Sequence, residues 1–268
     1  FRDNQDYEAD MFVNNHEAKE IMDDNTLLVV VDTNKPSITQ CEDLLYMAKM
    51  IVVLDHHRQG SDTIRNSVLS YIEPYASSAS EMVAEILQYF TEGIRIRNVE
   101  ADSIYAGIMI DTDNFMQKTG VRTFEAAAFL RRCGADVTRV RKLFREDMND
   151  YKARGETIRN AELFRGQFAI SECPSDYVDS PTVVGAQAAN ELLNIVGVKA
   201  SFVLTEYKGV IYISARAIDE VNVQIIMERM GGGGHLNMAG CQLETVDLEG
   251  ARSLLKSTLT EMQDGGEI

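Results

Sequence analysis

The organisation of this chain follows from one stretch of sequence, Ile51-Val52-Val53-Leu54-Asp55-His56-His57-Arg58. Its first four residues are apolar and mostly β-branched, and so short a run predicts a buried β-strand. An acid, two imidazoles and a guanidinium follow at once, just past the carboxyl end of that strand. Ligands bind at the carboxyl ends of the strands in open parallel α/β sheets, so these four side chains predict a functional site.

Two further apolar runs end in side chains of the same kind. Residues 26–31 lead into Asp32, and residues 104–110 lead into Asp111. If all three runs are strands of one parallel sheet, their carboxyl ends bring the carboxylates and imidazoles to one edge. Carboxylate oxygens suit hard divalent ions, and imidazole nitrogen favours manganese, iron or zinc over magnesium. The pattern therefore predicts a site for two metal ions.

The composition is that of a globular protein with real cores. The chain has 268 residues, 45% of them hydrophobic and 25% charged, which is enough for one large or two medium domains. No apolar run approaches the ~20 residues of a membrane span, so we expect no direct membrane contact from this segment. The four cysteines show no Cys-x-x-Cys pairing, which argues against a zinc knuckle or a disulfide framework and favours a reducing compartment.

The net charge of −16 weighs against a protein that grips long nucleic acid. Each phosphate that such a protein neutralises needs a lysine or arginine nearby. A small phosphodiester can instead be held by metals, a few basic groups and backbone amides. The charge balance thus favours a nucleotide-sized substrate.

The first part of the chain alternates strands and helices. A helix over 42–50 between two strands predicts a right-handed parallel crossover. Residues 77–90 predict a helix in which Ser78 and Glu81 form a capping box; Ser77 and Ser78 either cap this helix or face a phosphate at its amino terminus. A helix over 123–133 and a long helical stretch over 136–164, interrupted at Gly155, follow.

A domain boundary near Asp150 would divide the chain into residues 1–150 and 151–268. The second part mixes strands over 167–173, 199–207, 210–215 and 240–245 with helices over 182–196, 222–230 and 247–262.

Two polar features stand out in the second part. Arg216 ends a hairpin strand and is either a ligand-binding residue or a member of a surface ion pair. The run Gly231-Gly232-Gly233-Gly234-His235 follows a helix. One glycine is an ordinary helix cap, but four cost backbone entropy and predict the close approach of a ligand to the main chain.

These motifs together resemble a known family. Asp55-His56-His57 is similar to the name-giving motif of the DHH phosphoesterases, and Gly231–His235 with Ala239 resembles the signature of the associated DHHA1 domain. Val31-Asp32-Thr33 and Ile110-Asp111-Thr112 stand in the family's order. The run from Ile72 to Ser78 and the four-glycine loop resemble the bacterial cyclic-di-AMP phosphodiesterases of the GdpP (YybT) type.

The resemblance implies an α/β protein: a Rossmann-like parallel-sheet (DHH) domain that binds metal, followed by a smaller mixed-sheet α/β (DHHA1) domain that binds substrate. It implies hydrolysis of cyclic di-AMP to linear 5′-pApA with two Mn²⁺ ions. The implied metal ligands are Asp32, His56 and Asp111. The implied setting is the cytoplasm, as the catalytic part of a membrane-anchored protein.

The resemblance also implies catalytic and substrate-binding roles. His57 would meet the substrate phosphate or the leaving oxygen, while Asp55 and Arg58 would orient the histidines and the phosphate. The implied substrate-binding residues are Ser77, Ser78, Arg216, Gly231, Gly232, Gly233, Gly234 and His235. His235 and Arg216 would hold the second phosphate or a ribose.

The family's first motif, His-x-x-x-Asp-x-Asp, should precede Asp32, and residues 1–31 contain no match to it. We therefore expect the first strand and its metal ligands to be missing from this chain. The exposed sheet edge would favour association, and hence a homodimer. Two alternatives stay open: a hydrolase of very short oligonucleotides or of 3′-phosphoadenosine phosphate, and a nucleotide-binding module without full catalytic competence.

Overall fold

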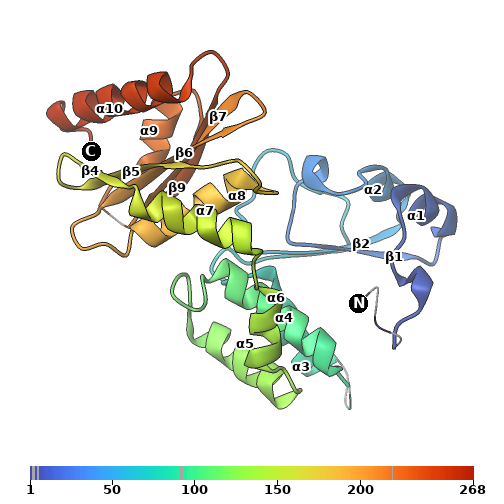
Figure 1. Cartoon of the computed structure of the whole chain (residues 1–268). Helices are drawn as coiled ribbons and strands as arrows, with labels where there is room; N and C mark the ends of the chain where they lie inside the picture. The colour runs from blue at the N-terminus through green and yellow to red at the C-terminus, as the bar shows by residue number, and fades with distance from the viewer. Residues whose placement is uncertain (2–3, 5, 91–92, 94, 219) are drawn as a thin grey trace. The chain divides into compact units, whose positions relative to one another are not determined.

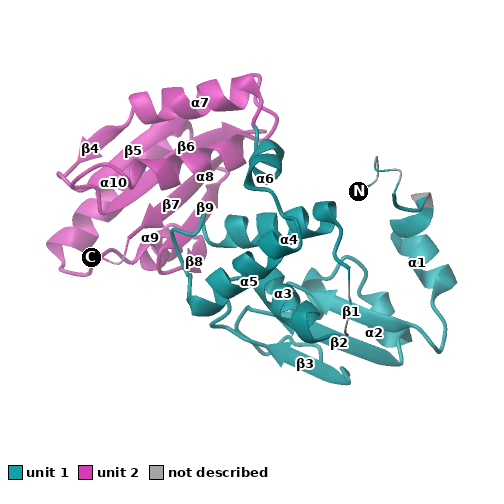
Figure 2. Ribbon diagram, turned by 90° about the horizontal axis from the view of Figure 1, so that it is seen from below, with its two compact units in different colours: residues 1–145 teal, residues 146–268 magenta. Residues whose placement is uncertain are grey.

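The computed structural model describes residues 1, 4, 6–90, 93, 95–218 and 220–268, which form two compact units. Unit 1 comprises residues 1–145 and unit 2 comprises residues 146–268 (Figure 2). Each unit has its own β-sheet and its own hydrophobic clusters. The units are therefore described one at a time.

Unit 1 combines a parallel sheet with a group of helices (Figure 1). Its elements are η1 (Ala9–Met11), α1 (Asn15–Ile21), β1 (Leu27–Val31), η2 (Pro36–Ile38), α2 (Asp43–Met47), β2 (Met50–Asp55), β3 (Leu69–Ile72), α3 (Ala79–Phe90), α4 (Asn98–Asp111), α5 (Val121–Arg132) and α6 (Val137–Leu143). Among the described residues β1, β2 and β3 pair in that order, and both pairs are parallel. This confirms the parallel α/β sheet that the sequence predicts.

The central strand β2 carries the buried part of this sheet. Ile51 and Val53 are almost wholly buried and pack with Leu45 of α2 and Ile64. The alternate side chains of β1 point to the other face and are half exposed. They are Leu27 at 52%, Val29 at 47% and Val31 at 51%.

Residues 104–110 do not form the third strand that the sequence predicts, because they lie inside helix α4. Ala101, Tyr105 and Ile108 of this helix are buried at helical spacing. Apolarity alone does not separate a buried strand from a buried helix. Gly107 lets α4 pack closely against α3, because a Cβ at this position would lie 2.1 Å from Ser80 Oγ on α3. Asp111 therefore sits at a helix end, not at a strand end.

The long helical stretch predicted over 136–164 is instead two helices, α6 and α7 (Met148–Arg159), followed by strand β4 (Glu162–Phe164). Asp147 caps the second of them by accepting a hydrogen bond from the Asn149 N–H (2.7 Å). Gly155 lies within α7 and does not interrupt it, contrary to the sequence-based expectation. The break falls at the capping aspartate.

Gly155→Ala is expected to raise the free energy of unfolding by about 0.5–1 kcal/mol, because glycine inside a helix loses more backbone entropy on folding than alanine does. The position is exposed, its φ is not positive and nothing lies within 4 Å of a Cβ built there. Urea unfolding of both proteins measures the change. An unchanged or lower value would contradict this account of the position.

Unit 2 is a mixed sheet with helices on both faces. Its elements are α7, β4 (Glu162–Phe164), β5 (Phe168–Cys173), α8 (Pro181–Leu192), β6 (Ala200–Tyr207), β7 (Val210–Ala217), α9 (Val223–Arg229), β8 (Gly233–His235), β9 (Met238–Leu243) and α10 (Leu248–Asp264). The strand order is β4-β5-β6-β7-β9-β8, in which, among the described residues, only β5 and β6 pair in parallel.

Strand β6 separates the two cores of unit 2. Phe202 and Leu204 face the core that α9 and α10 complete, whereas Val203 faces the core with α7 and α8. The hairpin at Lys208-Gly209 has positive φ at both residues (53° and 76°), the geometry of a tight two-residue turn. No helix among the described residues is both long and apolar enough to span a membrane.

Candidate metal and phosphate site

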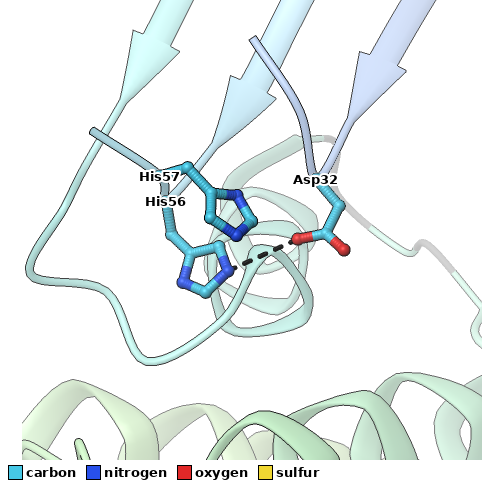
Figure 3. A group of neighbouring side chains, drawn as sticks. All are labelled: Asp32, His56 and His57. Carbon is cyan, nitrogen blue, oxygen red and sulfur yellow. Dashed lines mark ion pairs between the residues drawn. The ribbon is translucent and has the colours of Figure 1, made fainter. Parts of the chain in front are cut away.

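The side chains of Asp32, His56 and Asp111 come together in unit 1. His56 Nε2 lies 3.4 Å from Asp32 Oδ1 and 3.8 Å from Asp111 Oδ2. One ligand atom each from Asp32, His56 and His57 lie within 4.8 Å of one another. Figure 3 shows the two imidazoles and the Asp32 carboxylate gathered beyond the strand ends. Two strands and one helix thus supply what the sequence assigned to three strands.

Asp32 occupies a strained backbone position directly after β1. Its φ is 64°, a left-handed conformation that is uncommon for residues other than glycine, asparagine and aspartate. Its N–H still bonds to the Leu54 carbonyl (3.0 Å), which extends the pairing of β1 with β2 by one residue. This turn of the backbone presents the carboxylate, whose side chain is 60% exposed, toward His56.

Asp111 is positioned by the end of helix α4 and the turn after it. Buried Thr112 donates from Oγ1 to the Ile108 carbonyl (2.6 Å) and accepts from the Phe115 N–H (3.0 Å). Asp113, Asn114 and Phe115 all have positive φ, and the Phe115 ring is held between Tyr105 and Phe124. Aromatic packing therefore stabilises a strained turn next to a site carboxylate.

Asp55 is fully buried and orients His57. Its Oδ1 accepts hydrogen bonds from the His57 backbone N–H (3.2 Å) and from His57 Nδ1 (2.8 Å). Its Oδ2 accepts a hydrogen bond from Asn34 Nδ2 (2.6 Å). Sequence reasoning placed Asn34 in a simple turn and missed this contact. The sequence signal that could have indicated it is the run of polar residues around Asn34, directly after a buried strand.

Three other residues assigned from the sequence lie in different surroundings. Arg58 is exposed and, within the described chain, has no hydrogen bond or ion pair to the histidines. Ser77 and Ser78 are buried, and both hydroxyls bond to Glu81: Ser77 Oγ donates to its carboxylate, and Ser78 Oγ accepts its N–H (2.9 Å). The capping alternative for these serines therefore has direct support.

Burial is the main cause that raises the pKa of Asp111 above its ordinary value. His56 acts in the opposite direction, and the Asp32 carboxylate adds to the rise. In the metal-free protein the folded state thus holds this proton more tightly than the unfolded chain does. The stability from that difference is present below the unfolded pKa of about 4 and is lost as pH rises through the folded pKa.

Asp111→Asn is therefore expected to stabilise the metal-free protein around neutral pH, because it removes a half-buried charge. At acidic pH, where Asp111 is protonated in both states, the two proteins should be equally stable. Urea unfolding in the presence of a chelator across this range measures the difference. A constant difference at all pH values would contradict the assigned cause.

In unit 2, Arg216 and His235 lie in one row across three strands. Arg216 of β7 pairs with Met238 of β9, and Met238 pairs with His235 of β8. Directly paired residues share a sheet face, so Arg216 and His235 stand on the same face, about 10 Å apart at ~4.8 Å per strand. Ala215 and Ala239 point the other way, into the core with α9 and α10.

The Arg216 guanidinium has few polar partners among the described residues. It is partly buried and, within the described chain, its Nε has no hydrogen-bond partner, while Nη1 bonds to the Ala215 carbonyl (2.9 Å). None of the ion pairs among the described residues includes Arg216, so its interpretation as a member of a surface ion pair has no support here. Burial lowers the pKa of this guanidinium, which reflects the cost of keeping its charge unpaired.

The fold explains why some residues of the glycine run must be glycine, but it does not explain Gly233. A Cβ at Gly232 would lie 2.1 Å from the Gly240 carbonyl oxygen, and one at Gly234 would lie 2.5 Å from Ala239 Cα. These glycines let β8 pair closely with β9, so the run is part strand and not only the predicted loop. Gly233 has open space above it and no positive φ, so the fold itself does not require a glycine there.

Fold and site define a two-unit α/β protein with a carboxylate–imidazole cluster at the ends of parallel strands. The family model described as "DHH family, N-terminal domain" matches residues 4–108, and the DHHA1 domain model matches residues 167–261. The chain therefore belongs to the DHH family, with a DHH and a DHHA1 domain in that order. This confirms the resemblance drawn from the motifs.

Named relatives agree with this assignment. The chain is 43% identical over 259 residues to the cyclic-di-AMP phosphodiesterase GdpP of Bacillus subtilis, covering 95% of this chain and 39% of that protein. It is 41% identical to the cyclic-di-AMP phosphodiesterase PdeA of Listeria monocytogenes, covering 90% and 37%. The chain thus spans about two fifths of the length of these relatives.

The fold is shared with a solved structure. An exopolyphosphatase-related protein from Bacteroides fragilis superposes with a TM-score of 0.78 at 22% identity, covering 89% of this chain and 72% of that one. At this identity the likeness establishes the fold alone.

Proposed function

We propose that this chain is the catalytic part of a metal-dependent phosphodiesterase that hydrolyses cyclic di-AMP to linear 5′-pApA. The convergence of Asp32, His56, His57 and Asp111 at the strand ends of a DHH domain is the observation that carries the proposal. Unit 1 would hold the metal and the attacked phosphate. Unit 2 would bind the rest of the dinucleotide.

The residues present fit a divalent transition metal. Asp32, His56 and His57 each offer a donor atom within 4.8 Å of the others, and His56 Nε2 lies 3.8 Å from Asp111 Oδ2, so carboxylate oxygens and imidazole nitrogens form a mixed donor set. Such a set suits manganese, iron or zinc better than magnesium or calcium. We assign Asp32, His56 and Asp111 as ligands and manganese as the ion, with two ions expected in the intact enzyme. A bound ion would lower the pKa of a water molecule and offset charge on the phosphate.

The reaction forms one bond and breaks another. The oxygen of water bonds to phosphorus, the bond from phosphorus to the 3′ oxygen breaks, and that oxygen takes up a proton. His57 is suited to hold this proton, because the buried Asp55 carboxylate contacts Nδ1 (2.8 Å) and stabilises an imidazolium. The exposed Arg58 is left free to contact a phosphate oxygen.

Unit 2 offers a surface for the second phosphate or a ribose. Arg216 supplies a guanidinium without an acidic partner among the described residues, and His235 lies in the same row of the sheet. In the neighbouring row the paired glycines Gly233 and Gly240 carry no side chain, and Ser214 of β7 is the third member. A ligand there could approach the main chain beside the row that holds the two basic groups.

Incubation with cyclic di-AMP, linear pApA or 3′-phosphoadenosine phosphate, each with manganese, tests the proposal by chromatography of the products. We expect cyclic di-AMP to be converted to pApA. Preferential turnover of pApA or of 3′-phosphoadenosine phosphate would overturn the substrate assignment, and binding of cyclic di-AMP without turnover would overturn the catalytic one.

A further inference from the structure

Asn34 connects the end of β1 to the motif that follows β2. It is two residues beyond Asp32 in sequence, yet its side chain is turned inward and is only 2% exposed. Its amide Nδ2 donates to Asp55 Oδ2 (2.6 Å) and to the His57 carbonyl (3.3 Å). One side chain thus holds both ends of the segment from Asp55 to His57.

Asp55 needs such a donor because its carboxylate is fully buried. A buried charge is tolerated when its oxygens accept hydrogen bonds, and here Oδ1 is taken by His57 and Oδ2 by Asn34. Without Asn34, Oδ2 would lose this donor. The carboxylate could then rotate, and Oδ1 would no longer be held against His57 Nδ1.

The consequence falls on the proton of the His57 ring. When Nδ1–H is donated to Asp55, Nε2 carries the free electron pair, and a ligand atom of His57 lies within 4.8 Å of those of Asp32 and His56. We propose that Asn34 is a positioning residue that acts through Asp55 to set the tautomer and orientation of His57. This inference rests on the proposed function in one respect, namely that His57 takes part in the reaction.

The ring nitrogens of the metal-free protein can be observed directly by ¹⁵N–¹H NMR, and the chain has only four histidines to assign. When its ring is neutral, His57 of the wild-type protein should be protonated at Nδ1, the nitrogen that contacts Asp55. In Asn34→Ala, where the Asp55 carboxylate is no longer held against Nδ1, the Nε2–H form should appear.

Asn66→Ala is the matched control. Its amide also donates across unit 1, from Nδ2 to the Leu45 carbonyl (2.8 Å), but it does not contact the cluster. That variant should keep the wild-type tautomer of His57. A His57 ring that remains protonated at Nδ1 in Asn34→Ala would overturn the inference.

A pair of substitutions decides the matter if Asn34→Ala does not fold. Asn34→Asp alone places two carboxylates in contact and should lose the Nδ1–H form. Asn34→Asp combined with Asp55→Asn reverses the donor and the acceptor, and should restore it. Failure of the double variant to restore it would count against the inference. Wild-type turnover of cyclic di-AMP tests the proposed function separately, because the tautomer is read without metal or substrate.

Discussion

Asp32→Asn is expected to abolish hydrolysis of cyclic di-AMP, with a loss of ~10³-fold or more. A metal ion contributes several kcal/mol to a phosphoryl transition state, and each ~1.4 kcal/mol is a factor of ten in rate. Asparagine keeps the size of the side chain and tolerates the φ of 64°, so the fold should survive. Turnover and manganese binding, measured on the same preparation, check this result.

Two companion variants separate the loss of a ligand from a loss of folding. Asp32→Gly should be equally inactive but more stable than wild type by ~1 kcal/mol, because glycine adopts this φ without strain. Asp62→Ala, which removes an exposed carboxylate that bonds to Ser37, should retain activity. Substantial turnover by Asp32→Asn would remove Asp32 from the proposed ligands.

Arg216→Met is expected to weaken cyclic di-AMP binding by ~10²-fold while raising the stability of the protein. A charge-assisted hydrogen bond contributes about 1.5–3 kcal/mol, which is one to two factors of ten in affinity. The free protein gains stability because a partly buried guanidinium, which has no acidic partner in the described chain, is replaced by an apolar chain of similar length. Calorimetry and thermal unfolding measure the two effects.

Arg252→Met is the matched control for the change of side chain. Arg252 contacts Glu172 (2.9 Å) and Glu162 (3.3 Å), so its removal takes a partner from each of two carboxylates. That variant should lose stability and keep its affinity, the reverse of Arg216→Met. Gly233→Val adds an independent test, since it should reduce affinity without disturbing the fold at its open position. Unchanged affinity in both Arg216→Met and Gly233→Val would exclude this surface as a substrate site.

Much of the candidate site could be predicted from the sequence. Asp32 and the residues 55–57 follow short β-branched runs, and in parallel strands such positions share one edge whatever the details of packing. The mixed sheet of unit 2 was predictable for a similar reason, because alternating segments with turn residues between them are local signals. The resemblance to the DHH phosphoesterases added what spacing does not reveal, the chemistry these side chains serve.

Other features depend on contacts between distant residues. The run before Asp111 is apolar enough for either a strand or a helix, and it becomes helix α4 because its buried residues and Gly107 pack against α3. The serines before α3 instead bond to Glu81, a residue three to four positions further along the chain, so their capping contact is local, as the predicted capping box requires. For residues 104–110, then, a partner elsewhere in the fold selects between two locally acceptable conformations.

The sequence alone specifies which chemical groups this protein presents. It also specifies that two strand ends bring these groups to one edge of the sheet, because apolar periodicity and strand polarity are local properties. Three features instead follow from tertiary packing: Asp111 reaches His56 from a helix end, Asn34 lies against Asp55, and Arg216 is left without an acidic partner among the described residues. Each of these depends on where side chains from separate segments meet. No pattern along the chain encodes how close these side chains lie to one another, because their separation results from the packing of the whole unit.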